Sequence, residues 1–599
     1  MKRIHAILLL ILVFAGSLAA TAAEAPGKPT AITNVRIFDG ARVIPKGTVV
    51  VRGRTIAAAG PRVSAPAGAE VIDGSGATLL PGFIDGHTHT WGDALNRAVV
   101  FGVTTQLDMF TEPSFMRSMR EEQAKTGAPG RADLFSSGYL ATAPGGHGTE
   151  YGLPVPTLTR PEEAQAWVDA RVTEGSDYIK IIIEDGKPYG REIPTLDKPT
   201  VAALAAAAHR RKKLAVAHIS TEDSAQDALE AGVDGLVHIF TDRAPEAGFV
   251  SLAAKRKAFV TPTLTVVEST TGTSSGASLA DDPRLAPYLT AEEVQNLRRS
   301  FPHHPLDFQN ALDAVRQLKK AGVPILAGTD APNPGTAHGA SMHRELELLV
   351  KAGLTPAQAL AAATSVPARV FGLKDRGRIA PGLRADLVLV KGNPTSDIMA
   401  SRDILRVWKI GQEVPRPLAP PKTEAAAAAP QVPASGSISD FEDGTRTAAF
   451  GAWADSTDQL AGGKSVVRSE VVSGGAESGH SLAISGELKA GFAYPWAGAI
   501  FFPGPQPMAP ADLSRFAGIS FWAKGEDNPY QLLFFAEKLG RMPAVKTFTA
   551  GPEWKRYTYR FKDFGLDGKD VTGIFWGGGS GPGPFRLQID GVRLESSLP

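Results

Sequence analysis

The stretch Leu79–Thr90 reads Leu-Leu-Pro-Gly-Phe-Ile-Asp-Gly-His-Thr-His-Thr. Its first half, Leu79–Ile84, is the short apolar run of a buried β-strand, and His87 and His89 follow where that strand ends. In an extended chain, residues i and i+2 point to the same side, so both imidazoles can reach one metal ion. A single His-x-His pair is weak evidence, and the prediction of a metal site depends on ligands from other segments.

Later segments repeat this design, in which an apolar strand carries a possible ligand. They contain Asp-Tyr-Ile-Lys-Ile-Ile-Ile, Leu-Ala-Val-Ala-His, Gly-Leu-Val-His and Ile-Leu-Ala-Gly-Thr-Asp, and they supply Lys180, His218, His238 and Asp330. The chain has no cysteine, so any metal must be held by nitrogen and oxygen ligands. We interpret these residues, together with the first two histidines, as one site.

Residues 81–372 alternate strand-like runs with helix-like runs, and we expect this region to be one α/β domain. The strand candidates are Phe83–His87, Val103–Met109, Leu134–Tyr139, Tyr178–Ile183, Leu214–His218, Gly235–Ile239, Phe259–Leu264 and Pro324–Gly328. This alternation predicts a (β/α)8 TIM barrel, whose active site lies at the C-terminal ends of the strands. An open doubly wound sheet is the alternative, but it would not bring ligands from strands so far apart to one point.

The motifs resemble those of the amidohydrolase superfamily, within it the imidazolonepropionase-like and prolidase-like group with a paired-metal site. The resemblance covers Ala31–Gln412. It rests on Pro-Gly-Phe-Ile-Asp-Gly-His-Thr-His from Pro81, Gly-Thr-Asp at Gly328–Asp330, and Gly-Arg-Ile-Ala-Pro-Gly-Leu-Arg-Ala-Asp-Leu-Val from Gly377. Motifs of this length in this order are seldom accidental.

The resemblance implies two divalent ions, with zinc expected. It also implies that every strand-end residue named above is a metal ligand. One metal would be bound by His87, His89 and Asp330, the other by His218 and His238, with Lys180 as the bridge. Lys180 would be carboxylated by carbon dioxide, because an ammonium group at that place would repel both ions. Asp330 would act as general base beside a metal-bound hydroxide and then pass the proton to the leaving amine.

Three further residues are candidates for contact with the substrate. His147, in Pro-Gly-Gly-His-Gly-Thr-Glu-Tyr-Gly, follows the third strand on a glycine-rich loop, and the family has a similar segment near the substrate. We expect His147 to act as an oxyanion or substrate contact, with Tyr151 beside it. His338 follows the eighth strand, where it would either contact the substrate or support the start of a helix.

The remaining regions predict additional β-rich structure. Residues 29–80 and 373–412 are expected to form one small β-sandwich subdomain, and the Pro/Ala-rich tract 413–437 is expected to be a linker. Residues 438–599 have many short aromatic strands and predict an all-β jelly roll. This part resembles the complex I intermediate-associated protein 30 and carbohydrate-binding module group, which implies a possible glycan or envelope partner.

Composition and the N-terminus indicate an exported protein. Residues 1–22 have Lys2 and Arg3, an apolar run and small residues, which predict a signal peptide too short to span a membrane. The mature protein would therefore be secreted, with the periplasm as the expected compartment and no integral membrane segment. The formal net charge of +1 supplies no basic field, so we expect no nucleic-acid partner.

These observations predict a metal-dependent hydrolase that cleaves a carbon–nitrogen amide bond. The expected substrate is a dipeptide of the Xaa-Pro type or an N-acyl amino acid, because Lys180 supplies a bridging position that imidazolonepropionases do not use. One alternative is ring opening of a cyclic amide or lactone. Another is a glycan-binding or partner-binding role in which residues 438–599 dominate. The sequence does not indicate the oligomeric state.

Overall fold

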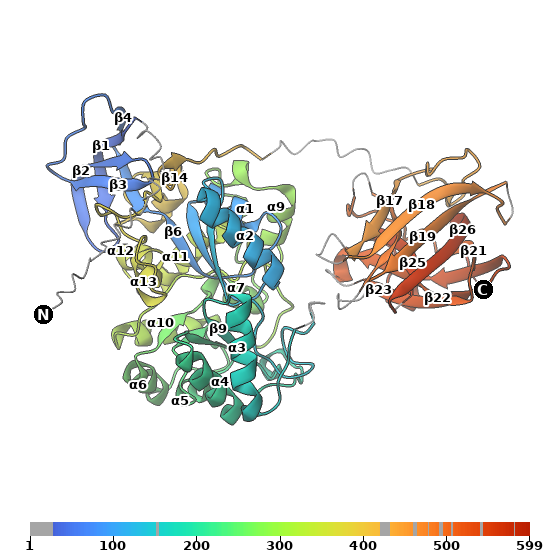
Figure 1. Ribbon diagram of the computed structural model, residues 1–599, viewed down its shortest axis with the longest axis horizontal. Helices are drawn as coiled ribbons and strands as arrows, with labels where there is room; N and C mark the ends of the chain where they lie inside the picture. The colour runs from blue at the N-terminus through green and yellow to red at the C-terminus, as the bar shows by residue number, and fades with distance from the viewer. Residues whose placement is uncertain are drawn as a thin grey trace, which may run out of the picture. The chain divides into compact units, whose positions relative to one another are not determined.

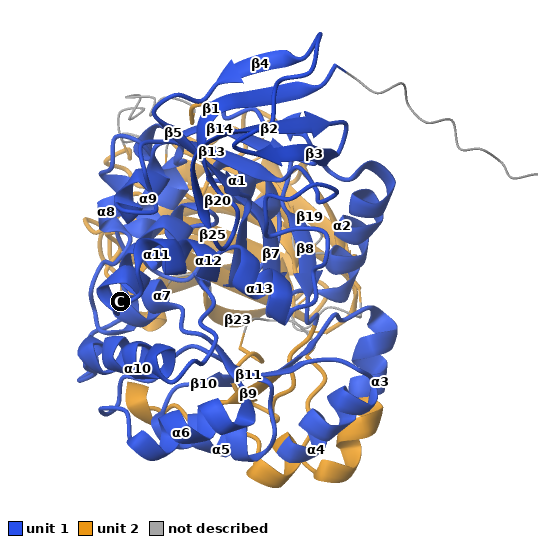
Figure 2. Ribbon diagram, turned by 90° about the vertical axis from the view of Figure 1, so that its left-hand side faces the viewer, with its two compact units in different colours: residues 1–138, 168–180, 202–417 blue, residues 139–167, 181–201, 418–599 orange. Residues whose placement is uncertain are grey.

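A computed structural model of the chain describes residues 28–150, 155–419, 432–458, 464–476, 479–489, 495–504, 507–539, 543–579 and 581–598. The predicted signal peptide, Tyr151 and residues 420–431 of the predicted linker lie outside the described residues. The chain divides into two compact units (Figure 2). The first contains residues 1–138, 168–180 and 202–417, and the second contains residues 139–167, 181–201 and 418–599.

A mixed eight-stranded sheet in the first unit combines the early strands with three late ones. Its order is β15-β14-β13-β5-β1-β2-β3, with β4 paired to β1. Antiparallel pairing of β13 with β5 joins the two sets of strands. Apolar side chains of both sets, among them Val35, Leu79 and Trp408, share one core. The strands are β1 (Thr30–Phe38), β2 (Val43–Arg52), β3 (Thr55–Gly60), β4 (Glu70–Asp73), β5 (Ala77–Pro81), β13 (Leu387–Lys391), β14 (Ile404–Lys409) and β15 (Gln412–Glu413).

The strands of the region 81–372 form two sheets, one of three strands in the order β6-β7-β8 and one of four in the order β12-β11-β10-β9. The pairs β6–β7, β7–β8, β10–β11 and β11–β12 are parallel. The strands are β6 (Phe83–Thr88), β7 (Val103–Asp108), β8 (Asp133–Ser136), β9 (Ile179–Ile183), β10 (Ala215–Ile219), β11 (Gly235–Val237) and β12 (Phe259–Thr261).

The eighth expected strand, Pro324–Gly328, is not a regular strand. It makes an isolated parallel bridge between Ile325 and Val260 of β12, and a second bridge joins Ala331 to Thr88 of β6. Backbone N–H groups of this segment and of its neighbours also donate across both junctions. The segment thus connects β12 of the four-stranded sheet to β6 of the three-stranded sheet by single bridges.

Helices follow most of the parallel strands (Figure 1). α10 illustrates their sequence logic: the side chain of Asp307 accepts the N–H of Gln309 at its start, and Ala311, Val315 and Leu318 bury one face. The helices are α1 (Ala94–Val100), α2 (Pro113–Thr126), α3 (Ala164–Glu174), α4 (Lys198–Arg210), α5 (Glu222–Glu230), α6 (Ala247–Arg256), α7 (Leu264–Thr270), α8 (Ala277–Ala280), α9 (Ala291–Leu297), α10 (Phe308–Lys320), α11 (Ala340–Lys351), α12 (Pro356–Ala362) and α13 (Ser365–Val370).

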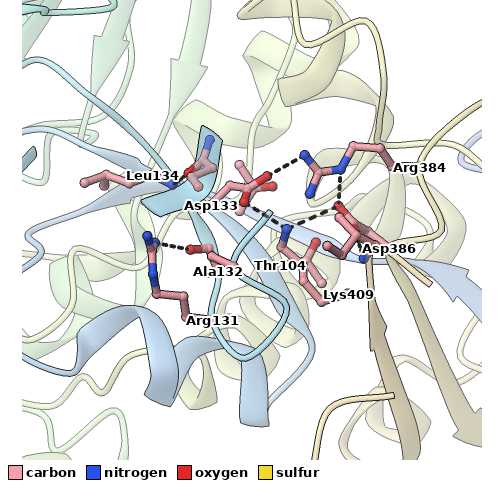
Figure 3. Close-up of polar contacts among 12 residues, drawn as sticks. Thr104, Arg131, Ala132, Asp133, Leu134, Arg384, Asp386 and Lys409 are labelled. Atoms are coloured by element: carbon pink, nitrogen blue, oxygen red, sulfur yellow. Dashed lines mark hydrogen bonds and ion pairs between the residues drawn. The ribbon is translucent and has the colours of Figure 1, made fainter. Parts of the chain in front are cut away.

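Buried charges connect the parallel strands to the eight-stranded sheet (Figure 3). Asp133 of β8 accepts a hydrogen bond from Lys409 of β14 at 2.8 Å, and both side chains are fully buried. Its second carboxylate oxygen lies 2.5 Å from Arg376 Nη1 and 2.8 Å from Arg384 Nη1. Burial opposes ionisation of Asp133, but the three cations outweigh it and lower the pKa of the carboxyl group. Arg384 also pairs with Asp386, so the cluster contains anions on both sides.

The C-terminal part of the second unit is all β (Figure 1, orange to red). One sheet has the order β18-β19-β26-β21-β24 with β16 paired to β26, and the other has the order β17-β20-β25-β22-β23. Neighbouring strands in both sheets pair antiparallel, and one apolar core contains residues of both sheets, among them Ile484, Phe521, Phe534 and Trp576. Trp576 is fully buried, so this tryptophan serves packing.

Aromatic runs in the sequence fall within several of these strands, such as β21, β22 and β24. The strands are β16 (Ser437–Ser439), β17 (Ala452–Thr457), β18 (Val466–Ser473), β19 (His480–Leu488), β20 (Ala497–Phe502), β21 (Gly518–Gly525), β22 (Asn528–Ala536), β23 (Ala544–Ala550), β24 (Lys555–Arg560), β25 (Val571–Gly578) and β26 (Gly583–Glu595). None of the helices in the described part of the chain combines the length and the apolar character that a membrane crossing requires.

Removing Asp133 will destabilise the first unit strongly. Asp133→Ala leaves Lys409 and Arg376 buried without their shared anion, and breaking a buried ion pair in this way costs about 3–5 kcal/mol. The measurement is the free energy of unfolding in urea. Arg160→Ala is the control, because it removes an exposed ion pair with Glu163 and is expected to cost less than about 1 kcal/mol. Equal effects of the two variants would contradict the structural importance of the cluster.

His343 will make the protein sensitive to acid. Its Nε2 faces the carbonyl of Phe101 at 3.2 Å and therefore donates, while Nδ1 lies 3.0 Å from the hydroxyl of Ser401. Burial, helped by Arg402, lowers the pKa of His343 from 6.5 to about 3. Between these values the unfolded chain binds more protons than the folded chain, so stability falls as the pH falls.

The expected contribution of His343 is roughly 1.4 kcal/mol for each pH unit within this window. His343→Gln should remove that part of the pH dependence, measured as the free energy of unfolding from pH 7 to pH 4. His209→Gln is the matched control, because this imidazole is 46% exposed and pairs with Asp234 at the surface. The same pH slope in wild type and His343→Gln would refute the prediction.

Candidate metal centre

Three predicted ligands, His87, His89 and Asp330, converge where the segment after α10 meets β6. Their ligand atoms all lie within 4.8 Å of one another. Nε2 of His87 is 3.2 Å from Oδ1 of Asp330, and Nε2 of His89 is 2.9 Å from the same oxygen. His87 lies in β6, and His89 follows it with the spacing that places both rings on one side of the chain.

The polar atoms of this group have contacts but lack hydrogen bonds. Both ring nitrogens of His87, Nδ1 of His89 and Oδ1 of Asp330 are buried without a hydrogen-bond partner. The short distances to Asp330 therefore lack hydrogen-bond geometry, and the ligand atoms of the three residues are gathered within 4.8 Å of one another. Buried polar atoms are normally satisfied, and a divalent cation held by nitrogen and oxygen ligands would satisfy these. The residues present thus fit a metal ion.

His238 and His218 extend the group along β10 and β11. The ring centroid of His238 lies 4.7 Å from that of His87 and 4.5 Å from that of His218. His218 lies in β10, and His238 follows directly after β11. His238 and Asp330 both have positive φ values, 71° and 56°. Such conformations are uncommon outside glycine and concentrate at functional sites.

Lys180 of β9 belongs to the same electrostatic environment. Its side chain is 1% exposed. Burial lowers the pKa of its amine to about 7, against the opposing effect of the Asp330 and Asp108 charges. The charge of Lys180 in turn acts on both His87 and His238. A neutral amine is accessible at this position near neutral pH, and it is the neutral amine that reacts with carbon dioxide.

The ionisation states of the group suit metal binding. Burial holds the pKa of His87 and of His238 well below the usual range, so both imidazoles are neutral and have a free lone pair to coordinate. The carboxyl group of Asp330 is buried beside both imidazoles of the first motif, and a divalent cation bound there would keep it ionised. Neutral imidazoles beside an ionised carboxylate are the forms that bind divalent cations.

Two buried carboxylates that the sequence analysis did not assign support this group. Asp85 accepts the N–H of His87 at 3.2 Å and the N–H and hydroxyl of Thr329 at 3.0 and 2.7 Å. It therefore holds β6 against the segment that carries Asp330. Burial raises the pKa of Asp85 to about 7. Asp85 was visible in the first motif, but only the tertiary contact to Thr329 shows what it does.

Asp108, the last residue of β7, holds the turn that follows His89. Its Oδ1 accepts the N–H and the hydroxyl of Thr90 at 2.7 and 2.9 Å, and its Oδ2 accepts the hydroxyl of Ser136 at 2.6 Å. The charge of Asp108 acts on Lys180 as well. The pattern that predicted the metal ligands, a polar residue where an apolar strand ends, also fits Asp108.

The predicted substrate residues are distributed over both units. His147 lies in the second unit, where its Nδ1 is 2.6 Å from Oε1 of Glu150. Tyr151 lies outside the described residues. His338 belongs to the first unit and is buried, with its Nδ1 3.2 Å from the side-chain nitrogen of Gln106 in β7. The roles of these residues at the substrate stay predictions.

Comparison with known proteins places the chain among hydrolases. Residues 78–414 match the Amidohydrolase family. The imidazolonepropionase of Deinococcus radiodurans is 28% identical over 376 residues, covering 59% of this chain and 88% of that protein. The imidazolonepropionase of Streptomyces griseus is 28% identical over 395 residues, covering 62% of this chain and 93% of that protein.

Solved structures extend the similarity. A putative prolidase from Bifidobacterium longum has a TM-score of 0.52 and 27% identity, and the match covers 66% of this chain and 97% of that one. A Xaa-Pro dipeptidase with methionine bound in its active site has a TM-score of 0.51 and 23% identity over 64% of this chain and 99% of that one, which supports the fold. The chain belongs to the amidohydrolase family, and it is a hydrolase that acts on carbon–nitrogen bonds.

Proposed function

We propose that this protein is an exported, metal-dependent amidohydrolase that cleaves the amide bond of a dipeptide, with Xaa-Pro dipeptides favoured, or of an N-acyl amino acid. The observation that carries the proposal is the convergence of His87, His89 and Asp330, whose buried ligand atoms lack hydrogen bonds. The identity of 27% with a putative prolidase supports the choice of substrate class. Export is proposed from the sequence of residues 1–22.

The site is proposed to hold two zinc ions at the C-terminal ends of the strands of a (β/α)8 barrel. The first metal would use His87, His89 and Asp330, and the second would use His218 and His238. Two such ions polarise a substrate carbonyl and lower the pKa of water to about 7. Lys180, as a carbamate, would supply the anionic bridge, because its buried amine shares the environment of Asp330 and both histidine groups.

Residues of the chain would supply proton transfer and the positioning of the ligands. Asp330 lies beside both imidazoles of the first motif, and with a cation bound its carboxylate would be ionised and able to accept a proton from water and return it to the leaving amine. Asp85 and Asp108 keep the ligand-bearing turns in place through backbone N–H groups. Burial of these groups strengthens each electrostatic interaction among them.

A second candidate is the hydrolysis of a cyclic amide or lactone, which the two imidazolonepropionases at 28% identity favour. It would use the same site residues with a different substrate. For residues 438–599 we propose a jelly-roll module that binds a glycan or an envelope partner; its two antiparallel sheets are compatible with this role, although a fold alone does not establish binding.

Metal removal should abolish hydrolysis. The mature protein is loaded with zinc, then assayed for free amino acids released from Xaa-Pro dipeptides and N-acyl amino acids, and for ring opening of cyclic amides and lactones. We expect release from the linear substrates that a chelator eliminates and zinc restores. Turnover of cyclic substrates alone would select the second candidate. Turnover that persists in the chelated protein would refute the metal-dependent proposal.

Replacing Lys180 should remove both activity and bound metal. Lys180→Ala deletes the bridging group, and the loss of several kcal/mol of charge stabilisation corresponds to a decrease of about 10³-fold or more in kcat/KM. Metal content per chain, measured by mass spectrometry of the elements, should fall in parallel. Lys125→Ala is the control, because this lysine is 74% exposed and forms only a surface pair with Glu121. A fully loaded and active Lys180→Ala variant would exclude the bridging role.

A further inference from the structure

Thr263 contacts His238, a proposed metal ligand, through a side-chain hydrogen bond. Its hydroxyl oxygen lies 2.7 Å from Nδ1 of His238, and both side chains are buried. A neutral imidazole has one donor and one acceptor nitrogen. When Nδ1 donates this hydrogen bond to Thr263, the proton lies on Nδ1 and Nε2 is the nitrogen that can coordinate. A partner of this kind fixes the tautomer and orientation of a metal-binding histidine.

The backbone of Thr263 has a conformation that its residue type disfavours. Its φ is 49°, in the left-handed region, and it directly precedes α7. A branched Cβ crowds the backbone there, so a threonine at positive φ is a genuine outlier that the surroundings must impose. Asparagine or glycine would adopt this turn more easily, but glycine could not supply the hydroxyl group that contacts His238.

Glu345 of α11 supplies that constraint. Its two carboxylate oxygens accept the N–H of Leu264 at 3.0 Å and the N–H of Thr265 at 2.9 Å, the first two residues of α7. Oε2 also accepts the hydroxyl of Thr265 at 3.0 Å. Glu345 is fully buried. The first turn of α7 is therefore anchored to α11 immediately beyond Thr263, which leaves the Thr263 backbone little freedom to relax.

We propose that Thr263 is a positioning residue for His238, and that Glu345 holds Thr263 in its disfavoured conformation by binding the start of α7. The inference rests on the proposed function in one respect, that His238 is a metal ligand. It adds a role for two residues from outside the ligand motifs, and it assigns α11 to the support of the metal site. Neither residue touches the substrate in this proposal.

The experiment compares metal affinity in four full-length mature proteins: wild type, Thr263→Val, Thr263→Ser and Thr265→Val. Thr263→Val keeps the branched shape and removes the hydroxyl, whereas Thr263→Ser keeps the hydroxyl. Thr265→Val removes a hydrogen bond to the same Glu345 carboxylate without touching His238. Each protein is titrated with zinc against a chelator, and metal retained per chain is measured after dialysis. Thermal unfolding of the metal-free proteins reports general stability.

We expect Thr263→Val to bind the zinc assigned to His218 and His238 about 10–100-fold less tightly, the usual effect of removing a hydrogen-bond partner of a ligand. Thr263→Ser and Thr265→Val should stay within a few-fold of wild type. Wild-type affinity in Thr263→Val would overturn the inference, as would an equal loss in Thr265→Val. If Thr263→Val does not fold, Glu345→Gln replaces it. The same loss of zinc affinity is expected, and wild-type affinity in that variant would refute the inference.

The result separates this inference from the proposed function. A wild-type protein that binds zinc while Thr263→Val binds it equally well refutes the positioning role alone. A wild-type protein that binds zinc but hydrolyses none of the amides leaves the positioning role intact and refutes the proposed activity. A wild-type protein that binds no zinc overturns both.

Discussion

The main physical constraint on this structure is the desolvation free energy of several ionisable side chains that are buried together in one site. Lys180, His87, His238 and Asp330 are all withdrawn from water, and burial alone would neutralise the lysine and oppose the carboxylate. They can coexist when a divalent cation takes the lone pairs of the neutral imidazoles and keeps the Asp330 carboxylate ionised. A divalent cation would therefore complete this group. Hydrogen bonds from the surrounding fold hold the proposed ligands in place.

Three buried carboxylates hold the segments that carry the proposed ligands. They accept hydrogen bonds from backbone N–H groups and are not proposed as metal ligands. Asp85 holds the strand of the first histidines against Thr329, Asp108 holds Thr90, and Glu345 holds the start of α7. Each fixes a turn directly beside a proposed ligand. Positioning the backbone in this way restricts the ligand side chains more tightly than packing alone, because a hydrogen bond has a narrow range of favourable geometry.

A second cluster of buried charges serves the scaffold. Asp133 binds Lys409, Arg376 and Arg384, and in this way it joins β8 to β14, 276 residues further along the chain, and to the segment that leads into β13. The eight-stranded sheet gains its own stability from the apolar core around Val35 and Trp408. The charge cluster determines where that sheet attaches, since buried charges tolerate only the arrangement that pairs them.

The sequence by itself determined the residue types of the centre, because an apolar strand followed by a histidine, lysine or aspartate is a local pattern. It indicated His87, His89 and Asp330, which the structure brings together. It could not indicate Thr263 or Glu345, since their significance lies in contacts between residues 25 and 80 positions apart. Nor could it foresee that Pro324–Gly328 makes isolated bridges in place of a regular strand. Local pattern fixes which side chains are available, whereas hydrogen bonds across the fold decide which of them support the others.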